Sequence, residues 1–491
     1  MYPWTFGQEN AESGEPAWHW LADWVAMPTL LATPAQPLAE MGEPASHLSE
    51  AVLEKFTALL GPKRVKQDLA ERARHGGSGT ADRLRLRCGD LSRLPDAVLY
   101  PRGPDDVLAL LAFCAQAGVA VTVFGAGSGP GALPQHGGHA ALVTFDLSAM
   151  SHLLSVDTMS GLARAEAGIT ADELARQLAA QGAALKGAMD GSLGGHIARN
   201  RQVPWLQSAK LATPEGAVAS GHWLAPGSQG AFGIITSASL RIQALPARTE
   251  YRRYLFTDFA SGLTALREAQ RQGLIQAEAL LWDASETRFH QQMDQMGRRR
   301  TLMEWLRDLY RHLRAFDRQA AALTIGFCGS ESGIDGQRKR FDALAKRLGA
   351  LALGPCMPQK TDHRDMLLDH GLAMDRIETT ANWAKLPRVY AAMRASLDRA
   401  MRAGAPRSGA HGLVLAQVSD AGHDGAKLRL TMIFPRMLGN DVAQAEAVRE
   451  AALKALAELT TPDEPLEEKL RLGIKQLLDP KAILNPGVRP L

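Results

Sequence analysis

Three glycine clusters lie at the ends of apolar, strand-like runs between residues 125 and 236. The first, GAGSGPG over residues 125–131, follows the apolar run 119–124, which is typical of a buried strand. The second is SLGGHIA over 192–198, and the third is GSQGAFGIIT over 227–236. Glycine lets backbone N–H groups converge on an anion, and it lets two backbones pack closely. The first cluster therefore predicts a phosphate cradle or a mobile surface turn, and the other two predict ligand contact or tight packing.

The first cluster does not fit the common nucleotide-binding motifs. Pro130 and Ala132 occupy the last glycine position of GxGxxG in its two registers, and no Gly-Lys-Ser/Thr follows. The next predicted element is a strand over 140–145 rather than a helix. A phosphate at this loop would therefore be held by backbone N–H groups and Ser128, without a helix dipole.

Charge and cysteine content exclude several classes of protein. The 55 basic and 52 acidic side chains give a net charge of +3, too small for general nucleic-acid binding. The four cysteines have neither zinc-site spacing nor a disulfide-framework pattern, so we expect no metal site and a reducing, cytoplasmic setting. They are Cys88, Cys114, Cys328 and Cys356. We also expect no integral membrane segment, because no run of about 20 apolar residues occurs.

Four tryptophans, Trp4, Trp18, Trp20 and Trp24, fall within the first 24 residues. Such a cluster suits either a membrane-interface anchor or a segment packed on the protein body. No basic amphipathic face accompanies it, which favours packing and leaves a peripheral membrane contact as the alternative.

The order of predicted elements indicates an α+β chain of several domains. Strands, glycine turns and helices alternate up to about Ala244, and Thr170 with Glu173 forms a capping box. After Tyr251 the elements lengthen, which predicts an antiparallel sheet with helices on one face. Its expected strands are 252–256, 322–327, 412–418 and 427–433, and its expected helices are 261–273, 335–348, 386–401 and 441–459.

Together these segments resemble the FAD-binding domain of the vanillyl-alcohol oxidase/p-cresol methylhydroxylase (PCMH-type) flavoprotein superfamily. Within it the chain is most similar to the alkyldihydroxyacetonephosphate synthase branch. The resemblance rests on the glycine clusters and on residues 72–89, 95–101, 167–170, 213–216, 283–287, 364–365, 378–383 and 479–487.

The resemblance implies a domain plan, a cofactor and a site. It implies an N-terminal helical extension (1–93), a shortened FAD-binding domain (94–246), a cap domain (247–470) and a C-terminal segment (471–491) that returns to the FAD domain. The cofactor implied is non-covalent FAD, and the partners expected are a small-molecule substrate and a second copy in a homodimer. The implied FAD-binding residues are Gly125, Gly127, Ser128, Gly129, Gly194, Gly195, Ile197, Ala198, Gly233, Ile234 and Asn485.

The chain departs from the family where the flavin and the substrate would meet. It is shorter at 187–193, 199–211 and 220–227. Leu280 stands where the family has an arginine, and the family's His-x-Ser-His-x-Tyr segment aligns with residues 417–422, which begin at Gln417. An amide cannot titrate as a histidine does. These replacements indicate a degenerate active site, and the sequence identifies no catalytic residue.

Three polar candidates remain. Arg364 suits either a substrate phosphate or a surface ion pair. His196 suits either a place near the flavin or a packed structural role, which we favour, and His423-Asp424 is a weaker acid–base candidate.

Two functions follow from the resemblance and its departures. The first is an FAD-dependent oxidoreductase or synthase-like enzyme acting on a glycerone-phosphate-like or hydroxy-acid substrate. The alternative is a flavin-free, catalytically degenerate homologue that serves as a binding or regulatory subunit.

Overall fold

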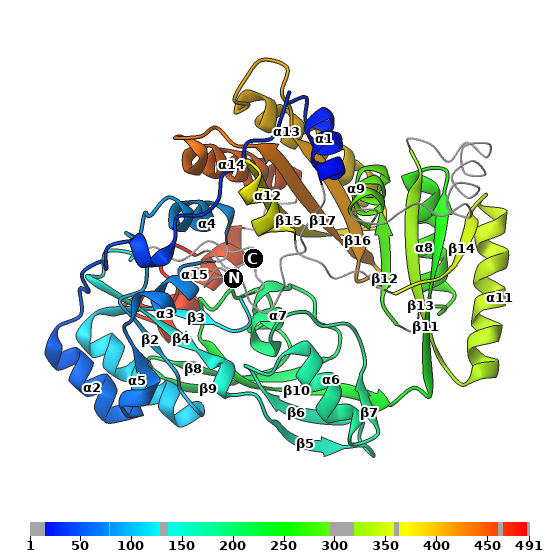
Figure 1. The fold of residues 1–491 in the computed structure, drawn as a ribbon. Helices are drawn as coiled ribbons and strands as arrows, with labels where there is room; N and C mark the ends of the chain where they lie inside the picture. Colours follow the sequence, from blue (N-terminus) through cyan, green and yellow to red (C-terminus); the bar gives the residue numbers. More distant parts are fainter. Residues whose placement is uncertain are drawn as a thin grey trace. The chain divides into compact units, whose positions relative to one another are not determined.

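The computed structural model describes residues 15–77, 79–127, 136–275, 277–294, 319–357, 363–459 and 465–488. They divide into two compact units (Figure 1). The described part of unit 1 lies within 35–245 and 465–488, and that of unit 2 lies within 15–34 and 246–459. The α+β fold class predicted from the sequence is confirmed.

The first sheet of unit 1 has the strand order β1-β2-β4-β3. Strands β2, β4 and β3 run parallel, whereas β1 is antiparallel to β2. Helix α5 (Pro104–Ala117) connects β2 to β3: Pro104 opens it and Gly118, at φ 67°, ends it. The strands are β1 (Val65–Lys66), β2 (Ala97–Leu99), β3 (Val119–Phe124) and β4 (Ala141–Asp146).

The second sheet of unit 1 is antiparallel, with the order β5-β6-β10-β8-β9 and β7 also paired to β10. Helices α6 (Ala171–Ala179) and α7 (Leu193–Arg199) accompany it. Thr170 caps α6 as predicted, because its hydroxyl accepts from the Glu173 N–H at 3.4 Å, but the Glu173 carboxylate accepts from Arg176 and Gln177 instead of completing the capping box. The strands are β5 (Leu153–Asp157), β6 (Leu162–Glu166), β7 (Ala183–Leu185), β8 (Leu206–Thr213), β9 (Gly216–Ser220) and β10 (Ile234–Ala244).

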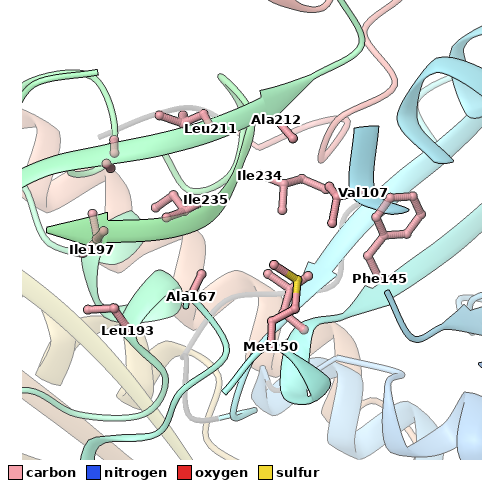
Figure 2. Close-up of a cluster of buried hydrophobic side chains, with 14 of the residues drawn as sticks. Val107, Phe145, Met150, Ala167, Leu193, Ile197, Leu211, Ala212, Ile234 and Ile235 are labelled. Carbon is pink, nitrogen blue, oxygen red and sulfur yellow. The ribbon is translucent and has the colours of Figure 1, made fainter. Parts of the chain in front are cut away.

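One hydrophobic core joins these two sheets (Figure 2). Phe145 of β4 and Val107 of α5 belong to the same buried cluster as Leu211 of β8 and Ile234 of β10. Apolar side chains of α7 complete it, so the glycine-containing turns are anchored by packed neighbours.

The remaining elements of unit 1 come from both ends of the described chain. They are α2 (Glu50–Leu60), α3 (Leu69–Arg74), α4 (Thr80–Arg87), α15 (Pro465–Leu478) and the 3₁₀ turns η1 (Leu38–Glu40), η2 (Pro62–Arg64) and η3 (Leu147–Ala149). After α15 the chain pairs with β3 through a parallel bridge between Val121 and Leu484. The C-terminal segment therefore supports the strand that leads into the first glycine cluster.

Unit 2 is built on one antiparallel sheet with the order β14-β11-β13-β12-β16-β17-β15. Residues 248–256 of β11 pair with 321–329 of β13 without a register shift. The strands are β11 (Arg248–Phe256), β12 (Ala279–Trp282), β13 (Ala321–Gly329), β14 (Leu351–Pro355), β15 (Leu372–Asn382), β16 (Leu413–Ser419) and β17 (Gly425–Pro435). The helices are α8 (Phe259–Arg271), α9 (Ala284–Asp294), α11 (Glu331–Arg347), α12 (Arg364–Asp369), α13 (Leu386–Ala403) and α14 (Asp441–Leu459).

Helices pack on both faces of this sheet, so the expectation of helices on one face is corrected. Gly262 of α8 lies against Leu281, which pairs with Val418, so α8 is on the face of the even-numbered β16 residues. Helices α9 and α12 share a core with Leu413 and Leu415, on the opposite face. The reason is that residues 413–416 form a continuous buried apolar run, which needs cover on both sides.

The N-terminal tryptophans that the structure describes pack on unit 2. Trp18 of α1 (Glu15–Trp24) stacks on His370 with ring centroids 3.6 Å apart. Trp20 and Trp24 also lie against this core, and the Arg288 guanidinium is 5.0 Å from the Trp24 ring. This supports packing on the protein body; Trp4 lies outside the described residues. No helix among the described residues combines the length and hydropathy needed to cross a bilayer.

Candidate functional site

The first two glycine clusters meet at the ends of β3 and α7. A Cβ on Gly125 would overlap the Oγ of Ser192, which caps α7 by accepting from the Gly195 N–H at 3.3 Å. A Cβ on Gly194 would lie 2.9 Å from that of Ala167. Both glycines are therefore required for close approach between neighbouring segments.

The third cluster is bonded to the second by backbone hydrogen bonds. The Gly227 N–H donates to the Ile197 carbonyl at 3.2 Å, and the Gln229 N–H donates to that of Ala198 at 2.9 Å. Gly233, at φ 150°, would place a Cβ 3.0 Å from the Ala212 carbonyl, and Ile234 after it pairs with Ala212. The three clusters predicted from the sequence thus form one region of unit 1.

Asn485 ties the C-terminal segment to this region. Its Nδ2 donates to the Gln229 carbonyl at 2.6 Å, and its backbone N–H donates to the Val121 carbonyl at 2.8 Å. Its Oδ1 and the Ser228 Oγ are buried without a hydrogen-bond partner among the described residues. Buried polar atoms usually have a partner, so these two atoms are available to a polar group from outside the described residues.

Backbone N–H groups distinguish the first cluster from the second. At α7 the N–H groups of Leu193 and Gly194 donate to Ile169 and Ala167 carbonyls, and that of His196 to Ser192. Among the hydrogen bonds of the described residues, none has the half-buried Ala126 or Gly127 N–H as its donor. Gly127 has φ 63°, which suits a backbone nest for an anion. Ser128 and Gly129, also predicted here, lie outside the described residues.

The buried His75 contacts the ends of β4 and β3, and β3 leads into the first glycine cluster. The Nε2 of His75 is 2.8 Å from the Asp146 Oδ2 at the end of β4, and its ring centroid is 4.3 Å from that of Phe124. The Nδ1 of the same ring is 2.8 Å from the Glu71 carbonyl. Nearby, burial and a hydrogen bond to the Glu71 carboxylate raise the pKa of Tyr100 above its usual range.

The segments 187–193 and 199–211, which the sequence predicts to be shorter than in the family, pack against one another. Trp205 stacks on His196 with centroids 5.4 Å apart and donates from Nε1 to the Ala188 carbonyl at 3.1 Å. The Nδ1 of His196 is 2.6 Å from the Asp190 carboxylate. Gly187 leaves room for the indole, whose Nε1 would be 3.0 Å from a Cβ there. His196 is therefore a packed, paired histidine, which is the structural role that the sequence favours.

Comparison with known protein families matches both halves of the chain. Residues 95–217 match the FAD binding domain model, and residues 245–461 match the model for the C-terminal domain of FAD linked oxidases. The chain is a PCMH-type FAD-linked oxidase family member. FAD is the cofactor of this family, and the convergent glycine clusters lie within or just beyond the FAD-binding match.

This family member is similar in sequence to alkyldihydroxyacetonephosphate synthases. The Dictyostelium discoideum enzyme is 26% identical over 371 residues, which span 67% of this chain and 60% of that protein. The Trypanosoma brucei brucei enzyme is 23% identical, and the alignment spans 87% of this chain and 78% of that protein. A solved alkyldihydroxyacetonephosphate synthase structure superposes with a TM-score of 0.78 at 22% identity, covering 96% of this chain and 92% of the other, which confirms the fold.

The residues of unit 1 fit an FAD diphosphate and its polar neighbours. The Ala126 and Gly127 N–H groups would hold the phosphates, since they are half-buried donors without a protein acceptor among the described residues. Ser228 Oγ and Asn485 Oδ1 would supply polar contacts. Helix α7 would instead form part of the wall of the FAD site, because its described backbone bonds are made within the protein. Its residues there are Gly194, Gly195, Ile197 and Ala198.

The residues of this PCMH-type chain that are candidates for substrate contact lie on one face of the unit 2 sheet. Leu280 and Trp282 point to the same face as Gln417, which pairs with Trp282. On this face Arg429 donates to Glu378 at 2.6 Å, and the Lys427 ammonium is 2.7 Å from Asp420. The face therefore carries two ion pairs, although Leu280 and Gln417 provide neither an arginine nor a titratable group.

Two further sequence candidates of unit 2 are Arg364 and the pair His423–Asp424. Arg364 begins α12 and is 8% exposed, so it is not a surface ion-pair residue. His423 and Asp424 form a 2.8 Å contact, but their side chains are 97% and 89% exposed in the turn between β16 and β17. That exposure removes the pair as an acid–base site, because it has no enclosed space for a substrate.

A cavity of about 560 Å³ opens beside α13 in unit 2. Trp24, Tyr390, Arg394 and His411 are among its lining residues. Arg394 pairs with the buried Asp283, whose Oδ2 also accepts from the Tyr390 hydroxyl at 3.0 Å. Burial raises the pKa of Asp283 to about 6. Neither Leu280 nor Gln417, which the sequence aligns with positions of the family's site, is among the lining residues, so the cavity is secondary to the sheet face as a substrate site.

Replacing Asn485 with alanine is expected to weaken FAD binding about tenfold. The change removes the buried bond to Gln229 and places alanine at φ 42°, which alanine rarely adopts. The loop at 227–233 then loses its tie to β3. Titration of the apoprotein with FAD, followed by flavin fluorescence, measures the dissociation constant. Asn440→Ala, at an exposed position of unit 2, is the control; equal affinities for the two variants would contradict the assignment.

Proposed function

We propose that the chain is an FAD-dependent enzyme that acts on a small anionic substrate of the hydroxy-acid or glycerone-phosphate kind. The observation that carries the proposal is that the half-buried Ala126 and Gly127 N–H groups have no acceptor among the described residues, in the region of unit 1 where the glycine clusters and Asn485 converge. Bound FAD would supply a ring that accepts electrons or forms adducts. The protein supplies donors for the diphosphate and, on the unit 2 sheet face, the Arg253 guanidinium as a cation for an anionic substrate.

Arg364 and Arg253 support the anionic class of substrate. Arg364 is buried at the start of α12, and Arg253 donates from Nε to the Thr324 hydroxyl at 3.2 Å on the face that carries Trp282. A guanidinium is well suited to bind a carboxylate or phosphate, since its donors match two oxygens at once. The similarity to alkyldihydroxyacetonephosphate synthases supports the glycerone-phosphate member of this class.

A second candidate function is a flavin-free, degenerate binding subunit. It is favoured by the shortened segments, where Trp205, His196 and Asp190 pack together, and by Leu280 and Gln417 on the sheet face. These residues offer no acid or base at the family's positions. The first candidate is preferred because the donors of the first glycine cluster are retained.

The absorption spectrum of the purified protein, before and after addition of FAD, tests the choice. The proposal expects flavin bands at near-stoichiometric occupancy and a rise in melting temperature with FAD. A colourless protein whose melting temperature does not respond to FAD would establish the second candidate. Anaerobic addition of a hydroxy acid then separates the chemistries, because net oxidation yields a keto acid and leaves a flavin that only an added electron acceptor restores, whereas an adduct-forming cycle needs no acceptor.

A further inference from the structure

Glu286 and His290 lie one helical turn apart at the start of α9, next to the end of β12. The Glu286 Oε1 is 3.1 Å from the His290 Nε2, and Glu286 is 7% exposed. Its backbone N–H donates to the Asp283 Oδ1 at 2.8 Å, which fixes the first turn of the helix. The other carboxylate oxygen, Oε2, is buried and has no hydrogen-bond partner among the described residues.

Trp282 brings a second unpaired group to the same histidine. Its indole stacks on the His290 ring, with centroids 4.4 Å apart and an interplanar angle of 23°. Trp282 is 3% exposed, and its Nε1–H has no acceptor in the part of the chain that the structure describes. One imidazole is therefore flanked by an unpaired buried acceptor and an unpaired buried donor, and leaving either unpaired costs free energy.

The chemistry of these two atoms selects the group that would bind them. The Glu286 Oε2 needs a donor and repels a carboxylate or phosphate oxygen, whereas the Trp282 N–H needs an acceptor and excludes an ammonium group. A hydroxyl both donates and accepts. The Arg253 guanidinium lies 4.8 Å from the Trp282 ring centroid, and this positive charge on the same indole would attract an anionic end of the same molecule.

We infer that Glu286 and Trp282 form a hydroxyl-binding subsite on the sheet face of unit 2, positioned by His290. The substrate hydroxyl donates to the Glu286 Oε2 and accepts from the Trp282 Nε1–H. The substrate is then a hydroxylated anion whose charge lies toward Arg253. This inference rests on the proposed function and assigns the residues that bind the alcohol group of its substrate.

Calorimetric titration of the FAD-loaded protein with two matched pairs of probes tests the subsite. The pairs are lactate with propionate, and glycerol 3-phosphate with propyl phosphate; members of each pair differ in their hydroxyl groups. In the native protein, one hydroxylated probe is expected to bind about tenfold to a hundredfold more tightly than its partner, because its hydroxyl bonds to a charged group. In Glu286→Gln and in Trp282→Phe this preference is expected to fall below about threefold.

The controls separate this inference from the proposed function and from a folding defect. Glu331→Gln, at an exposed position of α11, is expected to keep the preference for the hydroxylated probe. Flavin occupancy is read from the absorption spectrum of each variant, so loss of FAD is seen independently of probe binding. If Glu286→Gln does not fold, Trp282→Phe decides, since it keeps an aromatic ring against His290 and removes the N–H.

Three results would overturn the inference. Equal affinities within both probe pairs in the native protein would show that the two atoms bind only water. A preference unchanged in Glu286→Gln or Trp282→Phe would place the hydroxyl elsewhere. A preference lost equally in Glu331→Gln would show a general effect of charge.

Discussion

Gly168→Ala is expected to destabilise unit 1 by about 3 kcal/mol or more, which is among the largest effects of a single methyl group. The added Cβ would overlap the Leu147 carbonyl oxygen and would lie 2.6 Å from its carbon and 2.8 Å from the Met150 carbonyl oxygen. All three are backbone atoms, so no side chain can move aside. The Gly168 N–H also donates to Met150 at 2.9 Å, and the methyl group would strain that bond.

The effect of Gly168→Ala is measured as the temperature at which bound FAD is released on heating. For a unit of this size, a loss of about 3 kcal/mol corresponds to roughly 6–12 °C. Gly103→Ala is the matched control, because Gly103 has extended backbone and no atom within 4 Å of an added Cβ. Similar release temperatures for the two variants would contradict the close packing of Gly168.

Arg394→Met is expected to destabilise unit 2 by about 3–5 kcal/mol, because it leaves the buried Asp283 carboxylate without its counter-charge. Asp283 is 1% exposed, and Arg394 contacts its Oδ2 while also donating to the Val414 carbonyl at 2.9 Å. The remaining bonds from Tyr390, Glu286 and Ala416 are hydrogen bonds and bring no full charge. Urea unfolding monitored by circular dichroism measures the loss.

The destabilisation by Arg394→Met is expected to depend on pH. Burial already raises the pKa of Asp283 to about 6, above its unfolded value near 3.8, so protonation of this group favours the folded state. Its stabilising contribution is full below the unfolded pKa and is lost as pH rises through the folded pKa. Without Arg394 the pKa of Asp283 in the folded protein is higher still. The stability deficit of the variant, relative to the native protein, is therefore expected to shrink as the pH falls from about 8 to about 5.

Two variants check this interpretation of the ion pair. Arg399→Met on the same helix is the control, since Arg399 is exposed and donates only to the Ser396 hydroxyl among the described residues. Asp283→Asn combined with Arg394→Met is expected to recover part of the loss, because no buried charge then remains. A pH-independent loss in Arg394→Met would contradict a charged Asp283 as its cause.

Local patterns in the sequence were sufficient to predict many elements of the fold. The apolar run 119–124 is β3, and the residues around Thr170 cap α6 as expected, because strand periodicity and capping depend on neighbours in sequence. Helices on both faces of the unit 2 sheet were not predicted. The short helices α9 and α12 carry little periodic signal, and the need for cover on both sides of β16 depends on sheet order.

The candidate site was predicted in part. The three glycine clusters were identified as ligand or packing positions, and the structure brings them together through Ser192, Ala198 and Asn485. The pairing of His75 with Asp146, and that of Glu286 with His290, was missed. The only sequence signal for the second pair is the four-residue spacing of an acid and a histidine on a helix, which is common on solvated faces. Burial, which distinguishes this pair, is a tertiary property.

Gly125, Gly168 and Gly194 are each required by atoms of the protein itself, not by atoms of a ligand. A descendant of this fold that no longer bound a nucleotide would therefore still be selected for these glycines, since alanine at any of them would compromise folding. Conversely, the N–H groups of Ala126 and Gly127 serve no internal bond among the described residues, and their geometry is free to drift once a ligand is lost. In this chain, internal packing accounts for the three glycines, whereas the backbone at 126–127 is the part of the region that internal bonds among the described residues leave unexplained.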